Sequence, residues 1–244
     1  MNHVLFSALI SALFLILNAA ALLVVLTLNR REGARPAPPA AQPAEPRTLD
    51  AADILGWEFE YARITASEAM QDRHTMVNYY LLAAGILTSA AILAVGKESN
   101  LPAACGALLL WLLCGVGWFY FLKLIRLRQA WHGSAQAMNR IKEFYIAHAR
   151  DFTPQELGAA FRWRAETLPR PGKPWTLFFY SAMLIGFLDS VAYVVGAALL
   201  SLEATLASPW LARLCLLPLG VAFFLFHGWL YFAFLRPDGP SAAR

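Results

Sequence analysis

Five long stretches of sequence, each with at most one charged side chain, set the main limit on how this chain can fold. They cover residues 4–28, 77–95, 101–122, 177–200 and 211–234. A helix needs about 20 mainly apolar residues to cross a bilayer, and each stretch is close to that length or longer. The hydrophobic content of 59% is also high for a soluble domain. We therefore predict an all-α, polytopic membrane bundle with five transmembrane helices.

The first stretch differs from a secretory signal peptide in two ways. Its apolar part is much longer than the usual 7–15 residues, and no Lys or Arg precedes it. We therefore expect residues 1–28 to be an uncleaved N-terminal membrane anchor. Residues 29–48 follow as a Pro/Ala-rich segment without apolar periodicity, which predicts a semi-extended linker.

The distribution of Lys and Arg predicts the orientation of the chain. Of the twenty such residues, all but Lys97 and Arg213 fall on the same side of the five predicted spans. Lys and Arg concentrate on the cytoplasmic side of membrane proteins. The N-terminus is thus expected outside and the tail, residues 236–244, in the cytoplasm, across a bacterial-type inner membrane. The net charge of +4 then reflects topology, and no nucleic-acid partner is expected.

The second and third spans continue into helices that are too polar to remain in the bilayer. Residues 50–95 contain no proline and predict one helix about 70 Å long. The third span continues with a 3-4 spacing that is typical of a coiled-coil seam. The seam residues are Leu124, Leu127, Trp131, Ser134, Met138, Ile141, Tyr145 and His148. With only a short turn at 96–102, residues 49–150 predict an antiparallel hairpin with a cytoplasmic coiled-coil stalk.

Opposite charges on the two arms favour the same hairpin. Residues 50–73 carry six acidic residues and two Arg, whereas residues 123–150 carry six basic residues and one Glu. Folding about the turn places side by side residues whose numbers sum to about 198, and complementary charges along the arms help to set that register. The expected pairs are Asp72 with Arg126, Glu58 with Arg140, and Trp57 with Ile141.

Residues 151–176 predict a short amphipathic helix and a linker. Thr153 as N-cap, Pro154 at the first helical position and Glu156 form a capping box. The helix can rest on the inner leaflet or against the hairpin. Its apolar face is formed by Leu157, Phe161 and Leu168, with Arg162 and Arg164 near it. Residues 177–235 then form a second transmembrane hairpin.

Asp189 lies near the middle of the fourth span, where an ionisable side chain is costly and normally has a partner inside the bundle. His227 in the last span is a candidate partner, although helix rise places the two about 7 Å apart in depth. The candidate intramembrane polar site is Asp189, Ser190, Tyr193 and His227. It can act as polar glue between helices, as a proton or cation relay, or as a contact with a partner subunit.

A second group of polar residues gathers where the hairpin is expected to enter the inner membrane surface. This candidate inner-interface cluster is Asp72, Arg73, His74, Asn78, Tyr79, Tyr80, Lys123 and Arg126. Interfacial anchoring and pairing across the hairpin account for it most simply. The alternatives are a lipid-headgroup or small-ligand site, or a hinge that relays motion of the stalk.

Small residues repeat at four-residue spacing in two of the spans, which favours close helix packing. They are Ala182, Gly186 and Ser190 in the fourth span, and Gly85 and Ser89 in the second.

Catalytic and cofactor motifs are missing from the sequence. The unpatterned Cys105, Cys114 and Cys215 are expected to be buried apolar side chains. The histidines show no metal-ligand spacing, and His74, His132 and His148 can meet only if the hairpin register brings them together. We therefore expect no metal and no cofactor.

The function that these features favour is a non-enzymatic assembly, signalling or effector component of the membrane. It would act with copies of itself or with a membrane partner subunit. A small proton- or cation-coupled transport or conductance protein that uses Asp189 and His227 is the alternative. A membrane-embedded enzyme is the third hypothesis.

Overall fold

The computed structural model describes residues 51–96, 101–148, 168, 170–203 and 209–236, and this part of the chain contains helices and no strand. The helices are α2 (Ala51–Val95), α3 (Ala103–His148), α5 (Leu177–Glu203) and α6 (Pro209–Phe234). The predicted first span, the linker at 29–48, the capping box and most of the amphipathic helix lie outside the described residues.

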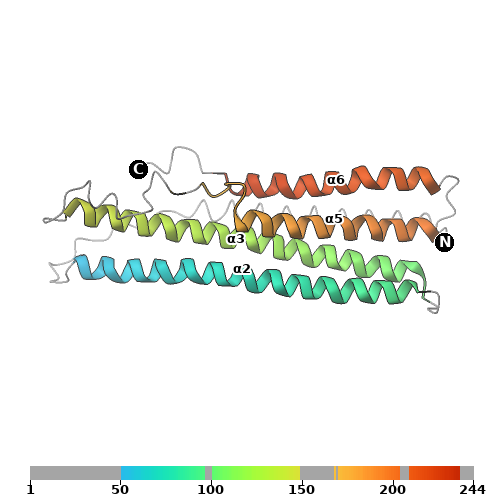
Figure 1. Ribbon diagram of the computed structural model, residues 1–244, viewed down its shortest axis with the longest axis horizontal. Helices are drawn as coiled ribbons and strands as arrows, with labels where there is room; N and C mark the ends of the chain where they lie inside the picture. Colours follow the sequence, from blue (N-terminus) through green and yellow to red (C-terminus); the bar gives the residue numbers. More distant parts are fainter. Residues whose placement is uncertain (1–50, 97–100, 149–167, 169, 204–208, 237–244) are drawn as a thin grey trace, which may run out of the picture.

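The four helices lie side by side and alternate in direction, in the order α2, α3, α5, α6 (Figure 1). Each is long and apolar enough to cross a membrane, as expected for a multi-pass membrane protein. Helix α3 packs against both α2 and α5, and α5 packs against α6, whereas α2 meets α5 at few points. The four described spans agree with the prediction. The remaining predicted span, residues 4–28, falls outside the residues that the structure describes.

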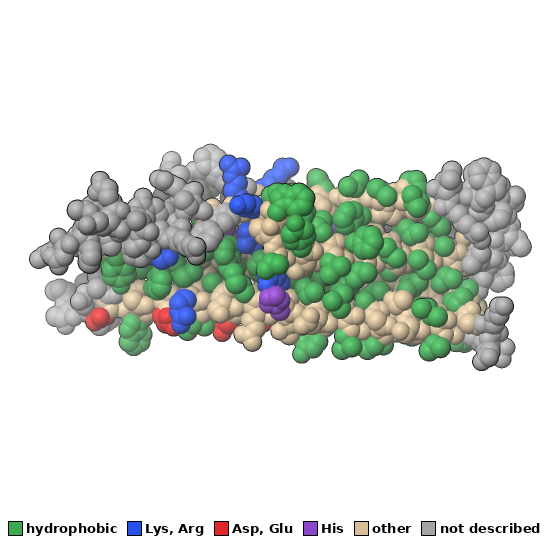
Figure 2. Space-filling model, in the orientation of Figure 1, with side chains coloured by type: hydrophobic (Ala, Val, Ile, Leu, Met, Phe, Trp, Pro, Cys, Tyr) green, Lys and Arg blue, Asp and Glu red, His purple; other side chains and the backbone are tan. Residues whose placement is uncertain are grey.

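Helices α2 and α3 are much longer than the other two. They contain 45 and 46 residues, against 27 and 26 in α5 and α6, so they run about 30 Å further at 1.5 Å per residue. The bundle ends near Gln129, whose Nε2 donates a hydrogen bond to the Phe234 carbonyl at 3.0 Å. We call residues 51–72 and 129–148 the stalk. In Figure 2, charged side chains lie on the stalk and at its junction with the bundle, and the rest of this face is apolar.

The two arms of the stalk approach through small residues rather than large ones. The buried side of α2 carries Ala62, Ala66 and Ala69, and alanine lets helix backbones come close. Trp57 is 82% exposed, so the predicted Trp57–Ile141 pair is wrong. The predicted register did not specify the rotation of α2 about its axis, which turns the alanine side of the helix, and not Trp57, toward α3.

The register of the hairpin lies within one helical turn of the prediction. Lys142 Nζ lies over the Phe59 ring, 5.7 Å from its centroid, and a Cβ on Gly56 would lie 3.9 Å from the Tyr145 hydroxyl. The residue numbers of both pairs sum to 201. No ion pair joins Glu58 to Arg140 within the described part of the stalk, and knobs-into-holes packing of the two arms stays a prediction.

Glycines set the spacing of the helices inside the bundle. A Cβ on Gly196 of α5 would lie 2.8 Å from Trp111 Nε1 of α3, and one on Gly186 would lie 2.9 Å from the His227 Cβ of α6. The predicted small-residue row of α5 therefore lies at a helix contact. Gly85 and Ser89 instead face away from the described helices, because α2 turns a different face, with Tyr80 and Ala91, into the core.

Candidate functional site: a buried polar cluster at Asp189

The carboxylate of Asp189 is completely buried between the helices. Its Oδ1 accepts a hydrogen bond from the hydroxyl of Tyr80 in α2 at 2.8 Å. Cys114 of α3 donates from Sγ to the Asp189 backbone carbonyl at 3.2 Å. Gly117, one turn further along α3, leaves the space that the carboxylate fills, because a Cβ there would overlap both carboxylate oxygens. Side chains and backbone of α2, α3 and α5 thus enclose Asp189.

His227 brings the fourth helix into this cluster. Its side chain is also fully buried, and its Nδ1 lies 2.9 Å from the Phe223 carbonyl oxygen. A carbonyl can only accept a hydrogen bond, so we assign the ring hydrogen to Nδ1. The opposite nitrogen, Nε2, faces Asp189 Oδ2 at 3.6 Å. Among the residues that the structure describes, neither Oδ2 nor Nε2 has a hydrogen-bond partner.

At 3.6 Å these two atoms lie just beyond hydrogen-bond distance, and we infer from their chemistry that one hydrogen belongs between them. With its hydrogen on Nδ1, a neutral His227 presents a lone pair at Nε2, and an ionised Asp189 presents another at Oδ2. Two lone pairs facing each other in a dry core would leave a buried carboxylate uncompensated, which costs several kcal/mol. The pair is stable as a carboxylic acid with imidazole, or as a carboxylate with imidazolium. In either form one hydrogen lies between the two atoms and the pair is neutral overall.

Aromatic rings surround the imidazole and exclude water from it. The ring centroids of Trp118, Phe121 and Phe223 lie 4.9, 4.9 and 4.8 Å from that of His227. The two phenylalanine rings stand nearly perpendicular to the imidazole, at 83° and 85°, which is a preferred arrangement for aromatic pairs. The rings therefore hold His227 in the orientation that keeps Nε2 toward Asp189.

The structure brings together two of the four residues predicted for the intramembrane site. The Asp189 and His227 side chains face each other between α5 and α6, with 3.6 Å between Oδ2 and Nε2. Ser190 donates its hydroxyl to the Gly186 carbonyl at 2.6 Å, a bond within α5. Tyr193 stacks on Trp111, with 6.4 Å between ring centroids, one turn away from the carboxylate. These two residues flank the polar cluster rather than bond to its charged atoms.

Tyr80 is the member of the cluster that the sequence prediction placed elsewhere. It was expected at the inner membrane surface, but it lies in the core and binds Asp189. Its neighbour Tyr79 is 60% exposed. The two tyrosines differ only in which side of α2 they occupy. The signal in the sequence is the 3-4 spacing that joins Tyr80 to Arg73 and Leu87 on one face of α2.

The rest of the predicted inner-interface cluster does not form one site. Arg73 turns inward, where its Nη2 lies 2.6 Å from His74 Nε2 and its guanidinium lies 5.0 Å from the centroid of the Phe178 ring. Other members have exposed side chains: Asp72, Asn78, Tyr79, Lys123 and Arg126. Within the part of the chain that is described, no group of three His, Cys, Asp or Glu side chains is placed to hold a metal ion.

Comparison with known protein families, with curated proteins and with solved structures finds no match to this chain. Its function is therefore argued from the geometry of its own residues.

Replacing Gly117 by alanine tests the packing of the cluster. The added methyl group would overlap the Asp189 carboxylate, so we expect the Gly117→Ala variant to lose about 1–3 kcal/mol, as overpacked cores do. Gly115→Ala is the matched control, since a Cβ at Gly115 meets nothing within 4 Å and alanine is the better helix former by about 1 kcal/mol. Thermal unfolding in one detergent measures both. A Gly117→Ala protein as stable as the Gly115→Ala protein would contradict the described site.

Proposed function

We propose that this protein is a non-enzymatic component of a bacterial-type inner membrane that presents its stalk in the cytoplasm to a partner subunit. The observation that carries the proposal is an exposed apolar row on the stalk part of α2, formed by Ile54, Trp57, Tyr61 and Ile64. Trp57 is 82% exposed and Tyr61 is 70% exposed. The four-helix bundle, fixed by its polar cluster, holds this row at a set distance from the membrane.

The apolar row stands in water rather than in lipid. Glu58, Glu60 and Arg63 lie among its members with exposed side chains, and Arg63 Nε donates to Glu60 Oε2 at 2.8 Å. That hydrogen bond holds the pKa of the Glu60 carboxyl below its usual value, so the carboxylate is charged at neutral pH. Ile64 lies nine residues before Arg73, about 14 Å further from the bundle. A contiguous apolar row in water is typical of a protein interaction site.

The charge beside the row indicates what kind of partner fits it. The row has the 3-4-3 spacing of a two-heptad seam, which a second helix can cover. Asp53, Glu58 and Glu60 occupy the flanking positions. Two copies of the row would bring these carboxylates together, which opposes self-association. An apolar helix with basic flanks is complementary, and this favours a different subunit over a second copy.

Photocrosslinking in intact membranes tests this assignment. A photoreactive amino acid in place of Trp57 should crosslink to one partner polypeptide, and the same amino acid at Gln136, an exposed polar position on the stalk part of α3, should not. Glu58→Lys should reduce the yield at Trp57 several-fold by opposing the basic flank. Glu143→Lys is the matched control on α3 and should leave the yield unchanged, since it reverses an exposed charge away from the row.

Two results would contradict the proposal. Equal yields at Trp57 and Gln136 would mean that the apolar row makes no specific contact. A product of twice the 27.0 kDa of the chain would identify a second copy as the occupant in place of a different subunit.

A proton relay through Asp189 and His227 is the second candidate function. The observation that favours it is the 3.6 Å separation between Asp189 Oδ2 and His227 Nε2, which belong to two fully buried side chains in the core of the bundle. In liposomes with an imposed pH gradient, a relay predicts proton flux that Asp189→Asn abolishes while the amount of inserted protein stays the same. Flux equal to that of protein-free liposomes would exclude the relay under these conditions.

A further inference from the structure

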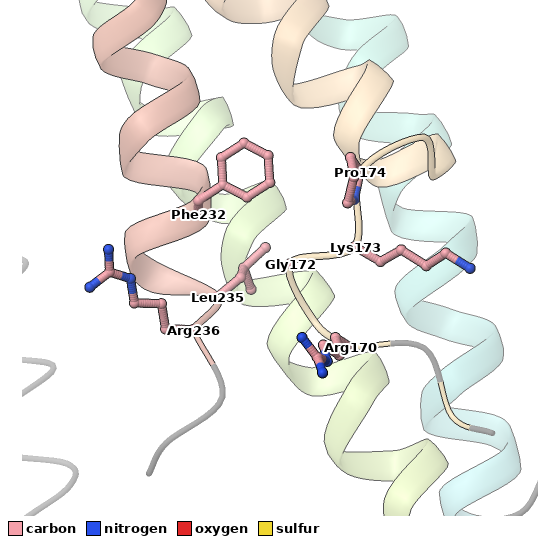
Figure 3. A pocket seen from close by; sticks show the side chains of 7 residues that line it. All are labelled: Arg170, Gly172, Lys173, Pro174, Phe232, Leu235 and Arg236. Carbon is pink, nitrogen blue, oxygen red and sulfur yellow. The ribbon is translucent and has the colours of Figure 1, made fainter. Parts of the chain in front are cut away.

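A hollow of about 530 Å³ lies where the loop before α5 meets the end of α6. Its apolar wall is formed by Pro174, Phe232 and Leu235. Arg170, Lys173 and Arg236 line it as well, and Gly172 completes the loop side. Figure 3 shows Phe232 and Leu235 reaching from α6 toward the loop, Arg170 near Gly172, and the chains of Lys173 and Arg236 extending outward on opposite sides. The site therefore combines an apolar wall with a cationic rim.

The loop that forms one side of this hollow is held in place by the bundle. Arg128 of α3 donates from Nε to the Pro171 carbonyl at 2.9 Å and from Nη2 to the Arg170 carbonyl at 3.4 Å. A Cβ on Gly172 would lie 3.2 Å from the Leu235 carbonyl oxygen, so the loop backbone rests directly on α6. Thr176 then caps α5 by accepting a hydrogen bond from the Phe179 amide at 3.2 Å. The loop backbone that carries Arg170 and Lys173 is thus fixed relative to the α6 wall before any ligand binds.

Positive charge at the hollow is not balanced by the described residues. No carboxylate lines it, and none of the three rim cations forms an ion pair with a described acidic side chain. Two buried guanidinium groups contact the Phe178 ring of α5, with Arg73 at 5.0 Å and Arg128 at 5.5 Å from the ring centroid. A cleft with several cations and no anion attracts an anionic ligand.

The exposed aromatic residue beside the loop is the kind of side chain found at the depth of lipid headgroups. Trp175 is 75% exposed and packs edge-on against Phe179, with 6.2 Å between ring centroids. Exposed tryptophan rings are typical of the membrane–water interface. Trp175 has a φ of 63°, a left-handed conformation that a bulky residue rarely adopts. In this conformation the Trp175 ring projects from the loop at the edge of the apolar bundle.

We propose that this hollow binds an anionic phospholipid from the leaflet on the stalk side. The phosphate would lie among Arg170, Lys173 and Arg236, and the glycerol and first acyl methylenes would cover Phe232, Leu235 and Pro174. Free phosphate shares the ionic part of this chemistry, but it would leave the apolar wall exposed to water. The lipid satisfies both parts of the site, and its binding does not depend on what the stalk binds.

Ligand titration of the full chain in mild detergent, followed by native mass spectrometry, tests the proposal. The probes are dihexanoylphosphatidylglycerol, dihexanoylphosphatidylcholine and inorganic phosphate. We expect one phosphatidylglycerol to bind saturably and about tenfold more tightly than phosphatidylcholine, because both carry the phosphate but the choline cation makes phosphatidylcholine neutral overall and is repelled by the cationic rim. Replacing Arg170, Lys173 and Arg236 together by Gln should remove that preference.

A matched variant separates the site from general charge attraction. Lys123→Gln, Arg126→Gln and Arg140→Gln together remove the same charge from exposed positions of α3 outside the hollow, and this variant should keep the preference. Phe232→Ala leaves the charge intact and should weaken phosphatidylglycerol several-fold without affecting phosphate. Thermal unfolding of each variant establishes whether it is folded. If the triple rim variant does not fold, the Phe232→Ala variant provides the test instead.

Three results would overturn the proposal. Equal loss of binding in both triple variants would mean that net charge alone attracts the lipid. Equal affinity for the two phospholipids would show that the rim does not read the headgroup charge. Inorganic phosphate that binds as tightly as phosphatidylglycerol, with the same dependence on the rim cations, would assign the hollow to a free phosphate group instead.

Discussion

A carboxylate cannot remain alone in the apolar interior of a membrane bundle, and the way in which Asp189 is accommodated determines much of this structure. Helices in a bilayer gain little from burying apolar side chains against each other, because lipid offers a similar environment. Polar contacts and close packing must therefore select one arrangement. Tyr80, Gly117 and His227 reach Asp189 from three helices, so a single side chain relates α2, α3 and α6 to α5.

The polar cluster also fixes how the helices are aligned along their length. Gly117 beside Asp189 and Trp111 beside Gly196 define one antiparallel register between α3 and α5. Gly186 beside His227 defines the register between α5 and α6 in the same way. Shifting one of these helices by a turn would separate the carboxylate from its partners and drive a Cβ into a neighbouring side chain. Because α2 continues without a break from the Tyr80 contact to the exposed Trp57, the same alignment sets the position of the stalk.

The sequence predicts the helical architecture well because its signal is strong. Uncharged runs of about 20 residues are typical of membrane spans, and an aspartate or histidine inside such a run is conspicuous, so Asp189 and His227 were both identified. The distance between the two side chains was not predictable, because the ends of a span read from composition do not fix how deep each residue lies relative to the neighbouring helix. Phe178 lies beside Arg73, so α5 begins about four residues, or about 6 Å, before the apolar part of α2. Between α5 and α6 a contact lies at Gly186, where an added Cβ would lie 2.9 Å from the His227 Cβ, so less than one further turn of α5 separates this contact from Asp189.

The packed side of the stalk part of α2 was harder to predict, because it is made of small residues. Ile54 and Trp57 are the most apolar choice for a contact, yet their side chains are exposed, while Ala62, Ala66 and Ala69 form the packed side. Hydrophobicity alone shows that a helix has an apolar face. It does not show which neighbouring helix, if any, covers that face. Which of Tyr79 and Tyr80 faces the core likewise depends on which side of α2 is packed. A row of alanines at 3-4 spacing that leads to one tyrosine is the signal that distinguishes them.

Thermal unfolding of Asp189→Asn and Asp189→Leu in the same detergent tests the central claim, that one hydrogen between Asp189 and His227 holds the bundle together. Asparagine can still accept from Tyr80 and can donate an amide hydrogen to His227 Nε2, so the account predicts an unfolding temperature close to that of the unmodified protein. Leucine leaves both partners unsatisfied in a dry interface, and that variant should unfold at a clearly lower temperature, a loss of about 1–3 kcal/mol. An asparagine variant as unstable as the leucine variant, or a leucine variant as stable as the unmodified protein, would contradict the account.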